Sequence, residues 1–270
     1  VLARGQRLKE LQGHGLWYRG KTRTHKVEVN TISELKPDDR YQFIFLTVRE
    51  NQVEEALEDI RENKSPNIVT MVNTIKPYGR WEKICGKGRI LPAFPGAGGC
   101  IEGGILDAQL LPRAIQPTTF GEIGGRKSSR EEALAYIFRK SHIPYQIVPE
   151  MHHWQISHLG VIVPLADAYY QSRHPEKICA NEKLMTLTAY RIKKNLKWIA
   201  QKGMLCPAKL YMIKDMPTGM LAGVLSRAYQ SEFGNKFLYR HAMHAPEEFQ
   251  RLHQEFYNYM KTHTKESNRI

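Results

Sequence analysis

Histidines are the most visible side chains with metal-binding or proton-transfer chemistry in this sequence. His152, His153 and His158 fall within one short segment, and His241 and His244 are spaced so that two imidazoles share one helix face. A metal site of a known type needs a third ligand at a recognised spacing, and neither group has one. We therefore predict no metal site and expect these histidines to be ordinary surface or core residues.

Two other motifs suggest a phosphate site or a nucleophile but lack a required part. The turn Gly96-Ala97-Gly98-Gly99 would need a glycine at position 101 to match the dinucleotide fingerprint GxGxxG, and that position is Ile101. No clear helix pattern follows that would offer its N-terminus to a pyrophosphate. We interpret the turn as a structural glycine-rich loop. A GxSxG nucleophile motif is absent, so the sequence gives no support to serine hydrolase chemistry.

Arg4 is more informative because it follows a short apolar segment, Val1–Ala3, that has the character of a strand end. In a dinucleotide-binding βαβ unit, the residue at the end of the second strand meets the adenosine ribose. An acidic residue there selects a free 2′-hydroxyl, and an arginine accommodates a 2′-phosphate. If Val1–Ala3 ends that strand, Arg4 is placed for NADPH. The residues alone leave an exposed arginine at a helix start as the alternative.

The elements that would position these residues alternate between strands and helices in the first half of the chain. Residues 41–48 form an aromatic and β-branched run that predicts a buried strand, and residues 67–73 predict the next. Between them, residues 51–64 have helical spacing and acidic first turns. Strand, helix and strand with short connections imply a parallel pair with a right-handed crossover. This is half of a doubly wound sheet.

The second half of the chain is predicted to be helical. Short glycine- and proline-rich segments follow residue 88, and a capping box at Ser129–Glu132 opens a helix. After Pro149 the apolar spacing is that of amphipathic helices, including helices near 217–241 and 246–262. We predict an α/β Rossmann-type domain with a mostly parallel, doubly wound sheet at 1–149, and an all-α domain at 150–270.

Composition excludes several classes of protein. The 270 residues carry 40 Lys and Arg against 27 Asp and Glu, a net charge of +13, and 41% hydrophobic residues are enough for a core, which excludes disorder as the main state. The most apolar stretch, 154–170, contains His158, Pro164 and Asp167, so we predict no membrane span. The basic residues are dispersed without a nucleic-acid motif, and the charge suits a small polyanion such as a phosphorylated cofactor. The widely spaced cysteines predict reduced thiols in a cytoplasmic protein.

Four segments together carry a resemblance to a known family. They are Val1–Leu8 with Gly15-Leu16, Phe45–Val53, Thr70–Asn73 and Phe120–Gly125. In order and spacing they are similar to segments of the ketopantoate reductase (2-dehydropantoate 2-reductase) family. The resemblance covers the whole chain and implies a Rossmann domain, a helical domain and NADPH-dependent reduction of a 2-keto acid, as in pantothenate biosynthesis. It also implies a homodimer.

The same resemblance implies roles for individual residues. Arg4 would hold the 2′-phosphate of NADPH, and Arg49 would lie near the adenine and its phosphate. Asn73 would sit beside the nicotinamide and the substrate. Glu232, in Ser231-Glu232-Phe233, matches the family's substrate-side glutamate.

Two departures from the family pattern matter. The glycine-rich first strand and turn would precede Val1, so we expect that the chain as given lacks its true beginning. The family's proton-donating lysine aligns with Gln155, and its two asparagines align with Leu159 and Val163. Glutamine has no proton to give near neutral pH. His158, or a water held by Gln155, is our hypothesis for the proton donor, and a packed helix residue is the alternative for His158.

The leading hypothesis is therefore an NADPH-dependent (NADP-linked) reductase of a small-molecule 2-keto acid. A non-catalytic NADP-binding paralogue is the competing hypothesis, since the lysine is missing. An opine-dehydrogenase-like oxidoreductase, which would use a histidine in its helical domain, is the third. None of them involves nucleic acid or a membrane.

Overall fold

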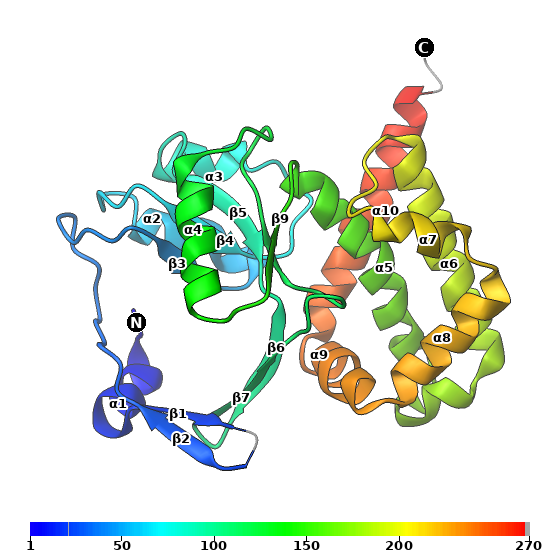
Figure 1. Ribbon diagram of the computed structural model, residues 1–270, viewed down its shortest axis with the longest axis horizontal. Coiled ribbons are helices and arrows are strands. Elements are labelled where there is room, and N and C mark those ends of the chain that lie inside the picture. The colour runs from blue at the N-terminus through cyan, green and yellow to red at the C-terminus, as the bar shows by residue number, and fades with distance from the viewer. Residues whose placement is uncertain (21, 268–270) are drawn as a thin grey trace. The chain divides into compact units, whose positions relative to one another are not determined.

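The computed structural model describes residues 1–20 and 22–267. The chain folds into two compact units. The α/β unit consists of residues 1–73 and 77–151, and the helical unit consists of residues 74–76 and the chain from His152 onward (Figure 1). The short segment Thr74–Lys76 thus leaves the first unit and packs in the second.

A five-stranded sheet in the order β3-β4-β5-β8-β9 forms the centre of the α/β unit. Its strands are β3 (Ile44–Leu46), β4 (Ile68–Met71), β5 (Ile90–Phe94), β8 (Thr118–Phe120) and β9 (Tyr145–Ile147). The first three strands are parallel, with Phe45 opposite Val69 and Val69 opposite Leu91. Strand β8 is antiparallel to β5 and parallel to β9. The predicted parallel pair of strands is confirmed.

Helices cover both faces of this sheet because β4 and β5 are apolar on both faces. Ile68 and Val72 lie in a buried cluster with residues of α2 (Val53–Asp59) and α3 (Gly79–Cys85). Val69, from the opposite face of β4, lies in a second cluster with α4 (Ser129–Lys140). The predicted helix at 51–64 is shorter in the structure, a 3₁₀ turn η1 (Glu50–Gln52) followed by α2.

A separate four-stranded sheet has the order β2-β1-β7-β6. Its strands are β1 (Leu16–Arg19), β2 (Thr24–Val27), β6 (Ala97–Glu102) and β7 (Ile105–Leu110). The prediction of a glycine-rich loop at residues 96–99 is therefore wrong, because Ala97–Gly99 begin a strand. A Cβ on Gly99 would lie 2.2 Å from the carbonyl oxygen of Asp107 on β7, so a glycine permits the two backbones to approach.

The start of the chain forms a single bridge and then a helix. Leu2 bridges Ile32 in parallel, with the amide of Ala3 donating to the carbonyl of Ile32 at 3.0 Å. Arg4 then occupies the N-cap position of α1 (Gly5–His14).

The N-cap of helix α4 is Ser128, one residue before the predicted cap Ser129. The hydroxyl of Ser128, not Ser129, accepts a hydrogen bond from the amide of Glu131 at 3.2 Å, and the Glu131 carboxylate accepts from the amide of Ser128. Both Ser128 and Ser129 precede acidic residues, so the sequence pattern fits two registers, and only the backbone decides between them.

The helical unit is built around one apolar core. Its helical segments are α5 (Met151–Gln171), η2 (Pro175–Ala180), α6 (Glu182–Gln201), α7 (Lys209–Asp215), α8 (Thr218–Gln230), η3 (Gly234–Tyr239), α9 (Arg240–His244) and α10 (Pro246–Ser267). The predicted long helix near 217–241 is divided into α8, the π-helical turn η3 and α9. In the described part of the chain, no helix combines the length and apolar character that a membrane crossing requires.

Candidate functional site

The carboxyl ends of the three parallel strands bring predicted site residues to one edge of the sheet. Arg49 follows β3 and Asn73 follows β4, the neighbouring strand. In open α/β sheets, ligands bind outside the carboxyl ends of the strands. The α/β unit therefore places two of the predicted residues where such a fold binds its ligand.

Asn73 carries an unused hydrogen-bond acceptor at this edge. Its Oδ1 atom is buried and has no hydrogen-bond partner among the described residues. Leaving a buried acceptor unsatisfied costs about 1–3 kcal/mol, so native structures keep few of them. The amide oxygen of Asn73 is thus an unsatisfied acceptor just beyond the carboxyl end of β4.

Arg49 lies on a turn that is fixed by its neighbours. Its backbone amide donates to Oε1 of Gln52 at 3.2 Å, and the adjacent Glu50 is buried. Glu50 forms an ion pair with Arg80, whose other nitrogen Nη1 donates to Oε1 of Glu54 at 2.8 Å. Arg49 itself is exposed on this anchored turn.

Arg4 is exposed and already has an acidic neighbour. Its Nη2 lies 2.9 Å from Oδ2 of Asp59, the last residue of α2, and the Arg4 side chain is 63% exposed. Exposed ion pairs contribute about 0–1 kcal/mol, so the pair is weak. An anionic ligand of Arg4 would have to compete with the Asp59 carboxylate for the guanidinium.

On α5, the two residues predicted to take part in proton donation, Gln155 and His158, differ in their surroundings. Gln155 is 1% exposed, so its amide is buried. His158 is half-buried, and its ring stacks on Trp154 with 4.9 Å between centroids and 9° between planes. Burial, with a smaller contribution from His241, lowers the pKa of His158 to about 3. The imidazole is therefore neutral at physiological pH.

Leu159 and Val163, which align with the family's asparagines, are buried in the core of the helical unit. They add no polar group to a site. Glu232 is exposed between α8 and the π-helical turn η3, a type of turn that is frequent at functional sites. Gly234 makes this turn possible, since a Cβ there would lie 2.0 Å from the carbonyl oxygen of Ala228.

Two ion pairs in the helical unit were missed by sequence reasoning. Lys76 Nζ lies 2.9 Å from Oε1 of Glu255 on α10, and Oε2 of Glu255 is buried with no hydrogen-bond partner among the described residues. His253 Nδ1 lies 2.9 Å from both carboxylate oxygens of Asp167 on α5. Lys76 lies three residues after Asn73, so the sequence alone could have drawn attention to this lysine. The partners on α10 are too distant in sequence to be inferred.

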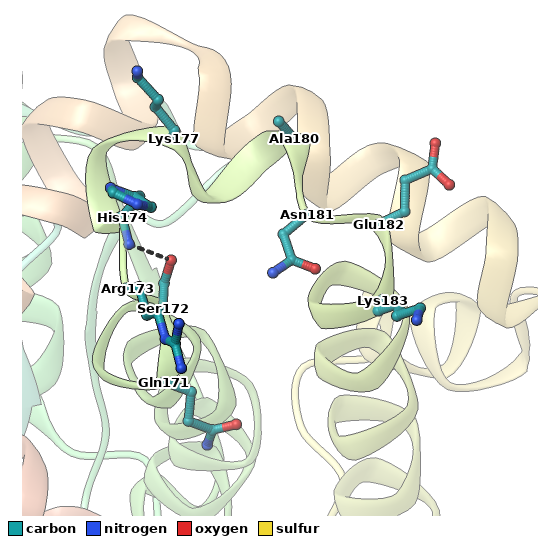
Figure 2. A pocket seen from close by; sticks show the side chains of 9 residues that line it. All are labelled: Gln171, Ser172, Arg173, His174, Lys177, Ala180, Asn181, Glu182 and Lys183. Atoms are coloured by element: carbon teal, nitrogen blue, oxygen red, sulfur yellow. Dashed lines mark hydrogen bonds between the residues drawn. The ribbon is translucent and has the colours of Figure 1, made fainter.

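A hollow of about 850 Å³ lies at the junction of α5, η2 and α6, apart from the predicted site residues. In Figure 2 the side chains of Lys177 and Glu182 point outward at its rim, and Asn181 points inward. None of the predicted site residues lines it. Within the described chain, no group of three or more His, Cys, Asp or Glu side chains is arranged to hold a metal ion.

Sequence comparison finds a similarity to a known family in the first part of the chain. The family model described as ketopantoate reductase PanE/ApbA matches residues 1–122. Residues 1–122 are thus similar to the ketopantoate reductase family. The matched segment includes Arg4, Arg49 and Asn73. Among curated proteins, none matches the sequence.

Solved structures show that the ketopantoate reductase fold extends over the whole chain. The 2-dehydropantoate 2-reductase from Geobacter metallireducens GS-15 is 15% identical with a TM-score of 0.64, covering 95% of this chain and 90% of that one. A PanE/ApbA family ketopantoate reductase from Ralstonia eutropha JMP134 is 11% identical with a TM-score of 0.61, covering 97% and 90%. D-mandelate dehydrogenase, solved with NADH and anilino(oxo)acetate, is 13% identical with a TM-score of 0.55, covering 95% and 88%. The predicted fold class is confirmed.

Proposed function

We propose that this protein reduces a 2-keto acid with a reduced nicotinamide cofactor, preferentially NADPH. The observation that carries the proposal is the unpartnered, buried Oδ1 of Asn73 at the carboxyl edge of a ketopantoate reductase-type sheet. The structural similarity to D-mandelate dehydrogenase, a protein solved with NADH, supports the nicotinamide class of cofactor.

The residues at the sheet edge fit such a cofactor. The nicotinamide ring, when bound, supplies a hydride to the carbonyl carbon of the substrate. Asn73 Oδ1 would accept a hydrogen bond from the N–H of the nicotinamide carboxamide. Arg49, exposed on its anchored turn, would contact the phosphates near the adenine. Arg4 would hold the 2′-phosphate in exchange for its weak pair with Asp59.

The exposed carboxylate of Glu232 would position the substrate. Of the two predicted proton donors on α5, His158 and a water held by Gln155, the histidine suits that role poorly. The low pKa of His158 leaves no imidazolium at neutral pH, and Gln155 cannot itself act as an acid, so it could serve only by holding a water. The proton of the reduction would therefore come from a water held by Gln155 or from another group.

Measurements of NADPH oxidation with 2-dehydropantoate and a panel of other 2-keto acids test the proposal. We expect keto-acid-dependent loss of nicotinamide absorbance, faster with NADPH than with NADH. Calorimetric titration with NADPH in the absence of substrate separates the alternatives. Binding without turnover of any keto acid would establish a non-catalytic NADP-binding protein, and absence of binding would overturn the cofactor assignment.

One observation favours a second function, that of an opine-dehydrogenase-like enzyme. The His253–Asp167 pair places a carboxylate on one ring nitrogen, which fixes the tautomer and leaves Nε2 as a base. Such an enzyme would reduce the imine formed from a 2-keto acid and an amino acid. Adding amino acids to the keto-acid panel distinguishes the two functions, because only the second requires both substrates.

A further inference from the structure

A hollow of about 410 Å³ in the helical unit is lined by several positive charges. It lies where α6 and the start of α8 pack together (Figure 1), and its lining includes Lys193, Lys194 and Lys197 of α6 and Thr218 of α8. None of the described residues that line it is acidic. The larger hollow at the junction of α5, η2 and α6 differs in this respect, because Glu182 lines it. A cleft lined by one sign of charge concentrates ions of the opposite sign, so the α6–α8 hollow favours an anion.

The three lysines lie on one face of α6 because of their spacing. Lys197 follows Lys193 by four residues and Lys194 by three, and residues at these spacings are neighbours on a helix surface. Like charges at such positions destabilise a helix. The one acidic residue of α6 is Glu182 in its first turn, about three turns before Lys193. No carboxylate of α6 therefore offsets the repulsion, whereas an anion in the hollow would.

Lys193 is held in place by uncharged groups. The residue is half-buried, and its Nζ donates to the backbone carbonyl oxygen of Met216 and, at 3.3 Å, to Oγ1 of Thr218. These acceptors orient the ammonium without neutralising its charge. Thr218 is the first residue of α8, and the N-terminus of a helix also favours negative charge. The fixed ammonium and the helix end thus add to the same preference for an anion.

Lys194 and Lys197 have no partner of their own. Both residues are exposed, and neither forms an ion pair or a hydrogen bond with any residue that the structure describes. Other exposed lysines of this chain do meet a carboxylate, as Lys26 meets Glu28 at 2.9 Å. The ammonium groups of Lys194 and Lys197 are therefore accessible to an anionic ligand without first breaking an ion pair.

Two aromatic side chains complete the lining of the hollow. Tyr190 is 55% exposed and precedes Lys193 by about one helical turn. Trp198 is half-buried and fixed, since its Nε1 donates to Oγ1 of Thr264 at 2.8 Å. Exposed aromatic rings bind the planar bases of nucleic acids and nucleotides by stacking. The volume of the hollow lies within the range of about 300–1,000 Å³ that is usual for small-molecule sites.

We propose that the α6–α8 hollow binds a nucleotide, a small ligand that joins a planar base to phosphate groups. The phosphates contact the ammonium groups of Lys194 and Lys197 beside the fixed Lys193, and the base stacks on the ring of Tyr190. The site uses no residue of the α/β unit. It therefore does not depend on the function proposed above, and it stands or fails independently of keto-acid reduction.

Calorimetric titration of the protein with GTP, without divalent metal ions, tests the proposal. We expect saturable binding with a Kd below about 1 mM, weakened by added NaCl because the ammonium groups are accessible to solvent. Tripolyphosphate should bind more weakly than GTP, and guanosine more weakly still. Arg4→Ala should leave the Kd for GTP unchanged. Absence of saturable binding would overturn the proposal, and so would a loss of GTP binding in Arg4→Ala, which would place GTP at the proposed cofactor site.

Replacement of the two free lysines tests the contact with phosphate. We expect Lys194→Gln combined with Lys197→Gln to weaken GTP binding by roughly tenfold or more, since charge-assisted hydrogen bonds are lost. Both side chains are exposed, so the variant should keep the fold. The matched control, Arg139→Gln with Lys140→Gln, removes two exposed cations from α4 and should leave the Kd unchanged. An equal loss in the control would show that binding follows net charge alone, and the proposal would be wrong.

Replacement of Tyr190 tests the contact with the base. Tyr190→Ala should weaken GTP binding by roughly fivefold or more and leave tripolyphosphate binding unchanged. The control is Tyr136→Ala, because Tyr136 on α4 is also 55% exposed and also has a lysine near its ring, with Nζ of Lys140 5.7 Å from the centroid. If Tyr190→Ala binds GTP like wild type, the hollow recognises no base and the nucleotide assignment is overturned. Much tighter binding of oligouridine than of GTP would indicate a nucleic-acid surface and would also overturn it.

Labelling with 5-fluorotryptophan locates the bound nucleotide. The chain has four tryptophans, and the ¹⁹F signal absent from the spectrum of Trp198→Phe belongs to Trp198. GTP should shift this signal and leave that of Trp81, which is buried in the α/β unit, in place. The signal of Trp81 is assigned in the same way from Trp81→Phe. An unmoved Trp198 signal at saturating GTP would show that the nucleotide binds elsewhere, contrary to the proposal.

Discussion

The imidazole of His158 lies flat against the indole of Trp154, with 4.9 Å between ring centroids and 9° between planes. The two residues are one helical turn apart on α5, and this stacking shields the imidazole from water. A charged imidazole would lose its hydration here, which is the main reason for its low pKa. His158 therefore fits the alternative of a packed helix residue better than that of a proton donor.

We predict that His158 makes the free energy of unfolding depend on pH. Its pKa is about 3 in the folded protein and near 6.5 in the unfolded chain. As pH falls through this window the unfolded state binds the proton first, so stability decreases, by at most about 1.4 kcal/mol per pH unit. Urea unfolding of wild type and His158→Gln between pH 7 and pH 4 measures the difference. The control His174→Gln changes an exposed histidine and should keep the wild-type slope. Identical slopes for wild type and His158→Gln would contradict the prediction.

Asn73 should contribute more to ligand binding than to stability. Replacing it with leucine removes an unsatisfied buried acceptor, so we expect the free energy of unfolding to stay the same or rise by up to about 1 kcal/mol. The same change should lower kcat/KM by roughly 10- to 100-fold, since a hydrogen bond to the ligand is lost. Urea unfolding and steady-state kinetics check the two halves separately. A large loss of stability would show that the Asn73 amide supports the fold.

Arg4 and Asp59 should have opposite effects on cofactor choice. Arg4→Ala should weaken NADPH by roughly tenfold or more and leave NADH nearly unchanged, because a charge-assisted hydrogen bond contributes about 1.5–3 kcal/mol. Asp59→Asn removes the competing carboxylate 2.9 Å from Arg4 and should strengthen NADPH binding. Fluorescence titrations with both cofactors measure the ratio. Arg7→Ala is the control, as Arg7 pairs with Glu10 instead, and an equal effect from it would argue against a specific role for Arg4.

The buried pair of Glu122 and Arg130 should be essential for the α/β unit. Burial opposes ionisation of Glu122, but hydrogen bonds from Arg130 and Ser128 outweigh it and lower the pKa of the carboxyl. Arg130 also donates to the carbonyl oxygen of Ile90 at 3.0 Å, so it joins α4 to β5. Arg130→Met should destabilise the protein by about 3–5 kcal/mol, since it leaves a buried carboxylate unpaired. Adding Glu122→Gln should recover part of that loss in urea unfolding. A double variant no more stable than Arg130→Met would show that the ion pair is not the cause.

The strands and helices that could be predicted are those whose hydrophobic pattern in the sequence matches their burial in the structure. The strands around Phe45 and Val69 are continuous apolar runs, and a short helical connection between them allows only a parallel pair. The α6 stripe that includes Met185, Ile192 and Ile199 repeats at helical spacing and is buried. The prediction of a loop at residues 96–99 is wrong for a physical reason. A glycine that permits two backbones to approach closely cannot be distinguished, from the local sequence, from a glycine in a loop.

Thus the order of residues alone specifies the α/β fold, the helical second half, the similarity of the first 122 residues to a known family and the positions of Arg4, Arg49 and Asn73 along the chain. Those features depend on periodicity and on neighbours in sequence. The unpartnered oxygen of Asn73, the low pKa of His158 and the pairing of Lys76 with Glu255 depend on the tertiary structure. Burial, and contact between residues far apart in sequence, arise only when the helices and strands pack.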